Sequence, residues 1–194
     1  SIYAAVIFKD IEIISFEPST SNTRTLSRNI SINNLENKIS IFPLALSDKE
    51  NIISYFNETR FAEGGSMSNF TSNTDYKGEI LRENEIKNKY NIFGTSIDSL
   101  IQNNILRVPN YIKIDVDGIE HLILKGAKNL LKNNNLKELS IEMNPSNLEQ
   151  YKFINKLMEE NDFKQIVSTN SRLLNDKDYK LGLNEIVNVI FKRN

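Results

Sequence analysis

Charged residues alternate along one short hydrophobic stretch of the chain, and their spacing could bring them together at a reaction site. Residues 111–117 read YIKIDVD, so apolar and charged side chains alternate strictly. In a β-strand this pattern places Lys113, Asp115 and Asp117 on one face. Three charges on a buried strand are costly unless they are paired or line a cleft. We interpret them as part of a functional site; the alternative is an ion pair of Lys113 with Asp115 or Glu142.

Two other apolar stretches also end in a carboxylate. Glu17 follows residues 11–16 and precedes Pro18, which disfavours the helical conformation for Glu17. A carboxylate at the edge of an α/β sheet can accept two hydrogen bonds from a ribose diol, although a charge favoured by the next helix dipole explains Glu17 equally well. Glu142 lies near the end of residues 136–143. Because ligands of open α/β sheets bind at the carboxyl ends of the strands, we expect the chemistry there.

The residue types exclude several other kinds of site. The chain has no cysteine, which excludes disulfides, thiolate metal sites and cysteine nucleophiles. Its one histidine, His121, excludes a multi-histidine metal site within this chain, and we expect no metal. His121 follows Glu120 in the first turn of an expected helix and has the pKa range of a general base. We favour an exposed or capping role for it.

Composition and charge describe an ordinary soluble domain. The 194 residues are 39% hydrophobic and 25% charged, and 24 basic residues against 25 acidic residues leave a net charge of −1. Such a balance indicates neither a nucleic-acid surface nor a polybasic membrane patch. No apolar run is long enough to span a membrane, and the N-terminal residues lack the pattern of a signal peptide. We expect one domain, without a membrane span, in the cytoplasm.

Short β-branched runs alternate with segments of helical spacing, which predicts an α/β fold with a mostly parallel sheet and helices on both faces. Residues 148–158 predict a helix capped by Ser146 or Asn147, residues 119–131 predict another, and residues 20–34 form a more polar candidate. The last two strands are expected to form an antiparallel pair at one edge. The expected strands are residues 11–16, 39–46, 111–116, 136–143, 164–168 and 186–192.

A long insertion separates the second and third of these strands. It contains the run Gly64-Gly65-Ser66-Met67-Ser68 and, over residues 76–90, a sequence typical of an extra charged helix. Insertions of this length often form a lid or a substrate wall, and a solvated loop is the alternative.

Residues 113–120 read KIDVDGIE and are followed by the pair Gly126-Ala127. Together they resemble the most specific signature of the FkbM-type methyltransferases, a branch of the Rossmann-like S-adenosylmethionine-dependent enzymes. Further matches follow the family's order and extend the resemblance over nearly the whole chain. They are Phe16-Glu17-Pro18, residues 29–33, Ala45-Leu46-Ser47, Ile97-Asp98 and Ile141-Glu142.

The sequence also departs from the family. Family members usually have glutamate where this chain has Asp117, and often aspartate where it has Asn110. Residues 1–6 resemble the helix that follows the family's first strand and glycine-rich turn, so we expect one methyltransferase-like domain over residues 1–194 that is N-terminally truncated. Because that first strand is central in the family's sheet, we also expect two half-sheets with unpaired edges, and poor binding of the cofactor.

The resemblance implies S-adenosyl-L-methionine as the cofactor and assigns roles to particular residues. Asp115 would face the methyl donor and the acceptor, supported by Lys113, Glu120 and Glu142 in roles that the resemblance does not separate. Glu17 would hold the ribose hydroxyls. The remaining residues of the implied cofactor site are Pro18, beside Glu17, and Ala45, Leu46 and Ser47, which would line the adenine.

The implied activity is O-methylation of a sugar or small-molecule hydroxyl, with Asp115 or Glu142 accepting or orienting the proton. The rival interpretation is a degenerate, non-catalytic Rossmann-like module of a glycan-assembly protein. A nucleotide-sugar transferase is a weaker third option, because Asp115-Val116-Asp117 has the bare Asp-x-Asp spacing but lies within a strand. The substrate is expected to be a small molecule or glycan, and the oligomeric state is left open.

Overall fold

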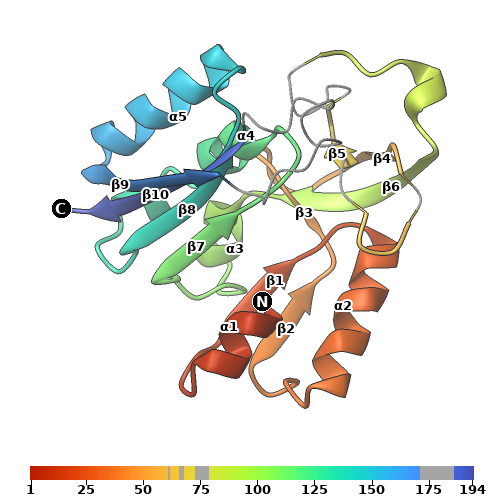
Figure 1. Ribbon diagram of the computed structural model, residues 1–194, viewed down its shortest axis with the longest axis horizontal. Helices are drawn as coiled ribbons and strands as arrows, with labels where there is room; N and C mark the ends of the chain where they lie inside the picture. The colour runs from red at the N-terminus through yellow and green to blue at the C-terminus, as the bar shows by residue number, and fades with distance from the viewer. Residues whose placement is uncertain (61, 66–67, 73–78, 171–185) are drawn as a thin grey trace.

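The computed structural model describes residues 1–60, 62–65, 68–72, 79–170 and 186–194. These residues form a mixed α/β fold built on three small sheets (Figure 1). Among the described strands, three pairs are parallel and four are antiparallel. The predicted mostly parallel sheet is therefore corrected to a mixed one. The antiparallel pairs arise in the long insertion and where the last strand of the chain enters its sheet.

The first sheet is a parallel pair with two helices packed on it. β1 (Ile13–Phe16) pairs with β2 (Ile39–Phe42). Ser19 caps α2 (Thr20–Ile32) by accepting a hydrogen bond from the backbone nitrogen of Asn22. α1 (Ile2–Ile7) completes this part of the molecule. Its small core consists of Ala5, Ile30, Leu35 and Ile39.

The second sheet has four strands in the order β7-β8-β10-β9. The first two are parallel, and β10 lies between β8 and β9 antiparallel to both, which confirms the predicted antiparallel pair at the end of the chain. Alternate residues of these strands, such as Ile114, Ile141 and Val189, enter the main core. The strands are β7 (Tyr111–Ile114), β8 (Glu138–Met143), β9 (Phe163–Asn170) and β10 (Val187–Arg193).

Three α-helices contribute to the main core against this sheet. α3 is Ile97–Gln102, α4 is Glu120–Lys125 and α5 is Leu148–Glu160. The predicted cap of α5 is confirmed, because the Asn147 side chain accepts from the backbone nitrogen of Gln150. The single helix predicted over residues 119–131 is instead divided. α4 ends at Gly126, and the 3-10 helix η2 (Leu130–Lys132) follows.

The third sheet, in the order β3-β6-β4-β5, occupies the insertion. The strand predicted over residues 39–46 breaks at Pro43, which has no backbone N–H to donate. A charged helix was predicted over residues 76–90, of which the structure describes 79–90. That prediction is wrong there, because the only helix in these residues is a short 3-10 helix, and from Asn88 onward they form a strand that pairs antiparallel with β4. The elements are β3 (Ala45–Leu46), β4 (Ile52–Glu58), β5 (Ser68–Phe70), the 3-10 helix η1 (Glu83–Glu85) and β6 (Asn88–Thr95).

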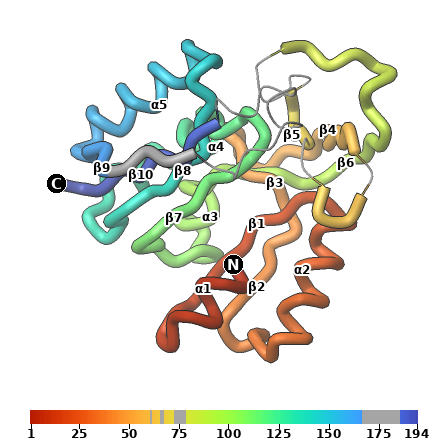
Figure 2. The backbone as a smooth tube through the Cα atoms, in the orientation of Figure 1, coloured from red at the N-terminus to blue at the C-terminus, as the bar shows by residue number. Residues whose placement is uncertain are grey.

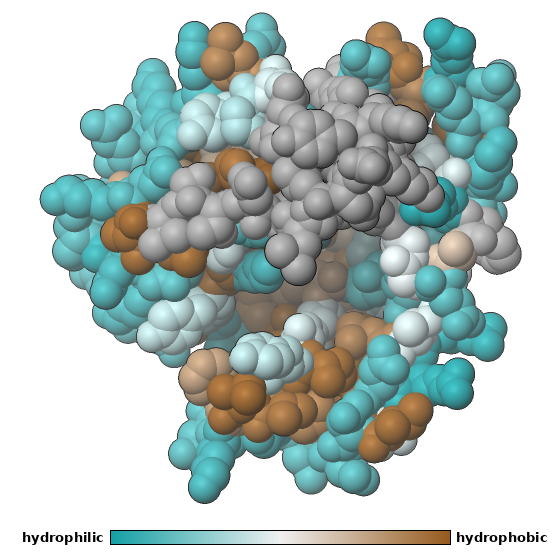
Figure 3. Space-filling model, in the orientation of Figure 1, coloured by the Kyte–Doolittle hydropathy of each residue, from teal (hydrophilic) through white to brown (hydrophobic). Residues whose placement is uncertain are grey.

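The β1-β2 pair and the four-stranded sheet share no strand pairing among the described residues, so the predicted division into two half-sheets is confirmed. The chain passes from one to the other through the third sheet (Figure 2). Ile14 and Phe16 of β1 pack against the main core, and an exposed ion pair of 3.7 Å joins Glu12 to Arg107. Figure 3 shows a hollow in the surface between the part that carries β1 and β2, at the bottom of the view, and the rest of the molecule above it. Hydrophobic side chains form the floor of this hollow.

Candidate functional site

Carboxylates from several strand ends form a row along one side of the fold. Electrostatic repulsion from Asp117 acts both on Glu17, after β1, and on Glu120, at the start of α4. Glu58 of β4 acts in the same way on Glu17, and Glu142 of β8 on Glu120. The row therefore connects the ends of β1, β7 and β8, as expected for strands whose carboxyl ends lie at one edge.

Glu17 is half-buried and bonded to the start of α2. Its Oε1 accepts a hydrogen bond of 2.9 Å from the backbone nitrogen of Ser19. Burial raises the pKa of Glu17 above its usual value, the hydrogen bonds from Ser19 and Asn22 oppose that rise, and the charges of Glu58 and Asp117 add to it. Pro18, the next residue, is also half-buried. A carboxylate fixed in this way has lone pairs for an incoming diol.

Glu58 belongs to this part of the site, although the sequence gave no reason to choose it. It is 2% exposed, and its carboxylate accepts from Ser19 Oγ at 2.7 Å, Asn88 Nδ2 at 2.8 Å and Tyr90 Oη at 3.3 Å. These bonds join β4 and β6 of the insertion to the cap of α2. No motif surrounds Glu58, so only the long-range strand pairing reveals it.

Lys113 of β7 and Asp115, just after β7, form an exposed ion pair beside the sheet β7-β8-β10-β9. Their side chains are 57% and 47% exposed, so the expectation of charges on a buried strand is wrong: β7 lies at the edge of its described sheet. The ion pair that the sequence left open as an alternative for Lys113 is thus present. Exposed ion pairs of this kind contribute little to stability.

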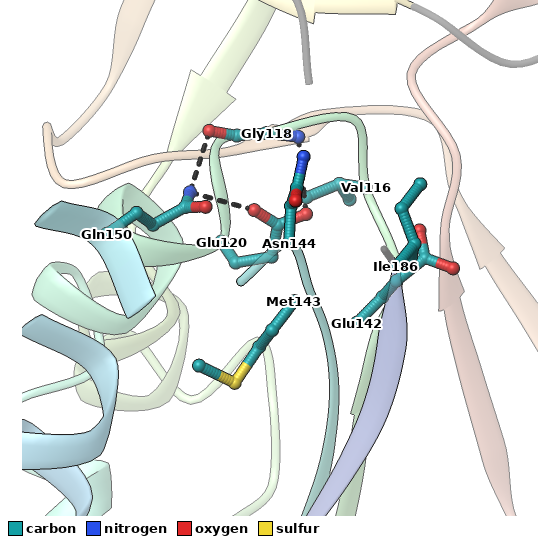
Figure 4. Close-up of a pocket in the computed structure, with 8 residues that line it drawn as sticks. All are labelled: Val116, Gly118, Glu120, Glu142, Met143, Asn144, Gln150 and Ile186. Carbon is teal, nitrogen blue, oxygen red and sulfur yellow. Dashed lines mark hydrogen bonds between the residues drawn. The ribbon is translucent and has the colours of Figure 1, made fainter. Parts of the chain in front are cut away.

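Glu120 and Glu142 line a small pocket (Figure 4). The four residues predicted to be catalytic therefore divide into two pairs, one exposed and one in the pocket. The remaining lining residues come from the turn after β7, the end of β8, α5 and the residue before β10: Val116, Gly118, Met143, Asn144, Gln150 and Ile186.

Glu120 is an unusually buried carboxyl group, with 3% of its surface exposed. Burial, with a smaller contribution from Glu142 and Asp117, raises its pKa to about 8, while hydrogen bonds from the backbone of Glu120 and Gly118 oppose the rise. None of the ion pairs among the described residues involves it. A neutral carboxyl group in such a position can donate as well as accept a hydrogen bond.

The segment predicted to line the adenine is mostly enclosed by the fold. Ala45 and Ser47 are 3% and 2% exposed, and Leu46 is half-buried against the main core. Ser47 Oγ donates to Asp48 at 3.2 Å, and the Ser47 nitrogen donates to the Thr95 carbonyl at 2.9 Å. Side-chain contact with a base would therefore come chiefly from Leu46 and the residues that follow it.

The insertion is hydrogen-bonded to Asn22 of α2 and to Asp117 of the acidic row. The Asn22 amide donates to the Gly65 carbonyl at 2.9 Å and accepts from the Gly64 nitrogen at 2.8 Å. The backbone nitrogen of Ser68 donates to Asp117 at 3.1 Å. Ser66 and Met67, part of the run noted in the sequence, lie outside the described residues. The described parts of this loop are thus held beside Glu17 and the turn after β7.

Comparison with known proteins places this fold in a family. Residues 5–165 match the profile described as the methyltransferase FkbM domain. This chain belongs to that family of methyltransferase domains. No curated protein matches the chain at the threshold applied.

A solved structure supports the same assignment at the level of the fold. The chain is similar to the crystal structure of methyltransferase FkbM from Methylobacillus flagellatus KT, with a TM-score of 0.56 and 14% sequence identity. The match covers 93% of this chain and 36% of that chain, so this chain spans about a third of the length of the solved one. No described helix has the length and hydrophobicity needed to cross a membrane.

Proposed function

We propose that this domain belongs to an S-adenosylmethionine-dependent methyltransferase that methylates a hydroxyl group of a sugar or small molecule. Family membership supports methyl transfer. The observation that carries the finer proposal is the row of carboxylates at the ends of β1, β7 and β8, since Rossmann-like enzymes hold ligands at such strand ends. The parallel pairs β1-β2 and β7-β8 support a Rossmann-like origin for this part of the fold.

The residues after β1 and β3 fit the cofactor unequally. Glu17 fits a ribose diol, because its carboxylate is fixed at Oε1 by Ser19 and is only half-buried. Leu46 could contact the adenine, whereas the buried Ala45 and Ser47 would shape its site from behind. When bound, S-adenosylmethionine supplies a methyl group activated by a sulfonium centre. The protein's task is then to align an acceptor hydroxyl with that methyl group.

The acceptor side of the proposed site lies beyond β7 and β8. Asp115 or Glu142 would take the proton of the acceptor hydroxyl as its oxygen is methylated. The ion pair with Lys113 would hold the Asp115 carboxylate in one direction. Glu120, which accepts from the backbone of Gly118, would hold the turn that joins β7 to α4.

The proposal is tested by methyl transfer from radiolabelled S-adenosylmethionine to a panel of sugar and small-molecule hydroxyl acceptors, with S-adenosylhomocysteine binding measured by calorimetry. We expect transfer to at least one hydroxyl acceptor. We expect the binding to be saturable but weak, on the order of millimolar, because the β1-β2 pair and the sheet β7-β8-β10-β9 share no pairing among the described strands. Absence of both binding and transfer would contradict the proposal. Binding without transfer to any acceptor would favour a non-catalytic module.

A further inference from the structure

Gln150 connects three polar groups around the pocket from the first turn of α5. It is 7% exposed. Its side-chain nitrogen lies 2.8 Å from the Gly118 carbonyl oxygen, 2.9 Å from Glu120 Oε2 and 2.9 Å from His121 Nδ1. Figure 4 shows the amide reaching toward both Gly118 and Glu120. One amide group therefore bridges the N-terminal ends of α4 and α5.

The contacts of Gly118 close this arrangement into a ring. Its backbone nitrogen donates to Glu120 Oε1 at 3.2 Å, while its carbonyl accepts from Gln150. Gly118 has a φ of +97°, a conformation that side-chain-bearing residues rarely adopt. The Gly118 nitrogen is shared between Glu120 and the Val116 carbonyl oxygen, which lies 3.0 Å away, and the Gly118 carbonyl is held by Gln150.

We infer that Gln150 is a positioning residue of the candidate site, which fixes the turn after β7 and aims the Glu120 carboxyl group into the pocket. The inference rests on the proposed function in one respect, namely that Asp115, three residues before Gly118, serves methyl transfer. Sequence analysis missed Gln150, because it belongs to no motif of the signature strand; its spacing with Ile154 and Met158, the buried residues four and eight positions on, was the available signal.

The residue type at position 150 follows from the groups around it. The uncharged amide nitrogen of Gln150 has two protons for two established acceptors, the Gly118 carbonyl oxygen and Glu120 Oε2, and His121 Nδ1 accepts in the tautomer that leaves it unprotonated. A carboxylate there would repel Glu120, and a hydrocarbon would leave the buried acceptors without that donor, which is costly. The charged or titratable groups near Glu120 and His121 come from every packed element. They are Asp117 in the turn, Glu142 on β8, Lys125 on α4 and Asp48 after β3.

The first test follows the titration of Glu120 by carbon-detected NMR in the wild-type chain and in Gln150→Met. The hydrogen bond from Gln150 stabilises the ionised carboxylate of Glu120. Its loss in Gln150→Met should therefore move the titration midpoint of Glu120 upward by about one pH unit. Glu149→Gln, an exposed neighbour in the same helical turn, is the matched control and should leave the midpoint in place. An unchanged midpoint in Gln150→Met overturns the inference.

A second measurement needs no variant. In the wild-type chain the two side-chain amide protons of Gln150 should exchange with solvent at least about tenfold more slowly than those of the exposed Gln165. Equal exchange rates would overturn the inference even if Gln150→Met failed to fold.

The functional readout separates this inference from the proposed function. With an acceptor from the screen, Gln150→Met should lower kcat about tenfold and change the KM for S-adenosylmethionine little. An unchanged kcat would overturn the positioning role. If the wild-type chain transfers no methyl group, the proposed function fails, while the titration of Glu120 still decides the role of Gln150.

Discussion

Gly126 packs so closely against Ser47 that a β-carbon on the glycine would overlap the Ser47 carbonyl oxygen. The same β-carbon would lie 3.0 Å from the Ser96 β-carbon. The glycine of the Gly126-Ala127 pair is therefore explained by packing: it lets the end of α4 lie against the segment that follows β3. The φ of Gly126 is −83°, so space rather than backbone conformation requires glycine here.

Gly126→Ala should destabilise the fold by about 1–3 kcal/mol, because backbone atoms have to move to admit the methyl group. The measurement is urea unfolding followed by circular dichroism. Lys128→Ala, two residues along and exposed, serves as the control. A Gly126→Ala protein as stable as the wild type would show that the Ser47 segment yields easily, and it would remove the packing explanation.

The buried carboxyl group of Glu120 makes stability depend on pH. Its pKa is raised from 4.5 to about 8 in the folded chain, so between these values the folded state binds more protons than the unfolded state. Its stabilising contribution is complete below about pH 4.5 and is lost as the pH rises toward 8. The loss is on the order of 3 to 5 kcal/mol. His121, whose pKa is lowered, acts in the opposite direction near neutral pH.

Unfolding free energies at several pH values between 5 and 9 measure this effect. Comparing the wild type with Glu120→Gln isolates Glu120, since His121 is common to both. The variant should show a clearly smaller fall of stability with rising pH, whatever its absolute stability. Glu36→Gln, at an exposed position, should keep the wild-type slope. Parallel slopes for wild type and Glu120→Gln would mean that Glu120 is not protonated in the folded protein at neutral pH.

The sequence was sufficient for those parts of the fold that local patterns determine. The alternation over residues 111–117 correctly predicted that Lys113 and Asp115 lie on the same side of the chain, but the strand is not buried as expected, because β7 lies at the edge of its described sheet. Of the two residues predicted as possible caps of α5, Ser146 and Asn147, the structure has Asn147. The division into two half-sheets followed from the family resemblance and is confirmed for the described strands.

The third sheet could not be predicted in the same way, because its pairing joins residues far apart in the chain. β4 pairs with β6 from Ile52 with Gly94 to Glu58 with Asn88. The charged residues before β6 were interpreted as helical because their partner strand was not known. The burial of Glu120 has a similar origin: a glutamate in a first helical turn is ordinarily exposed, and Gln150 of α5, thirty residues away, meets it in the fold.

Glu17→Gln tests the proposed ribose contact. Replacing the carboxylate by an amide keeps the size of the side chain but substitutes a donor group for one acceptor oxygen, so S-adenosylhomocysteine binding should weaken about tenfold. Glu12→Gln, exposed just before the same strand, should bind as the wild type does. Calorimetry measures both. Equal affinities in Glu17→Gln and wild type would assign Glu17 to the support of α2 through Ser19 instead.

Asp115→Asn tests which carboxylate takes the proton in the proposed reaction. The amide nearly preserves the shape of the side chain, but it cannot accept a proton and loses the ion pair with Lys113. If Asp115 is the base, methyl transfer should fall by about 100-fold or more, with S-adenosylhomocysteine binding unchanged. Lys113→Met removes only the other half of the ion pair and should cause a smaller loss. If Asp115→Asn transfers at nearly the wild-type rate with binding intact, Asp115 is excluded, and Glu142→Gln becomes the variant in which the large loss is expected.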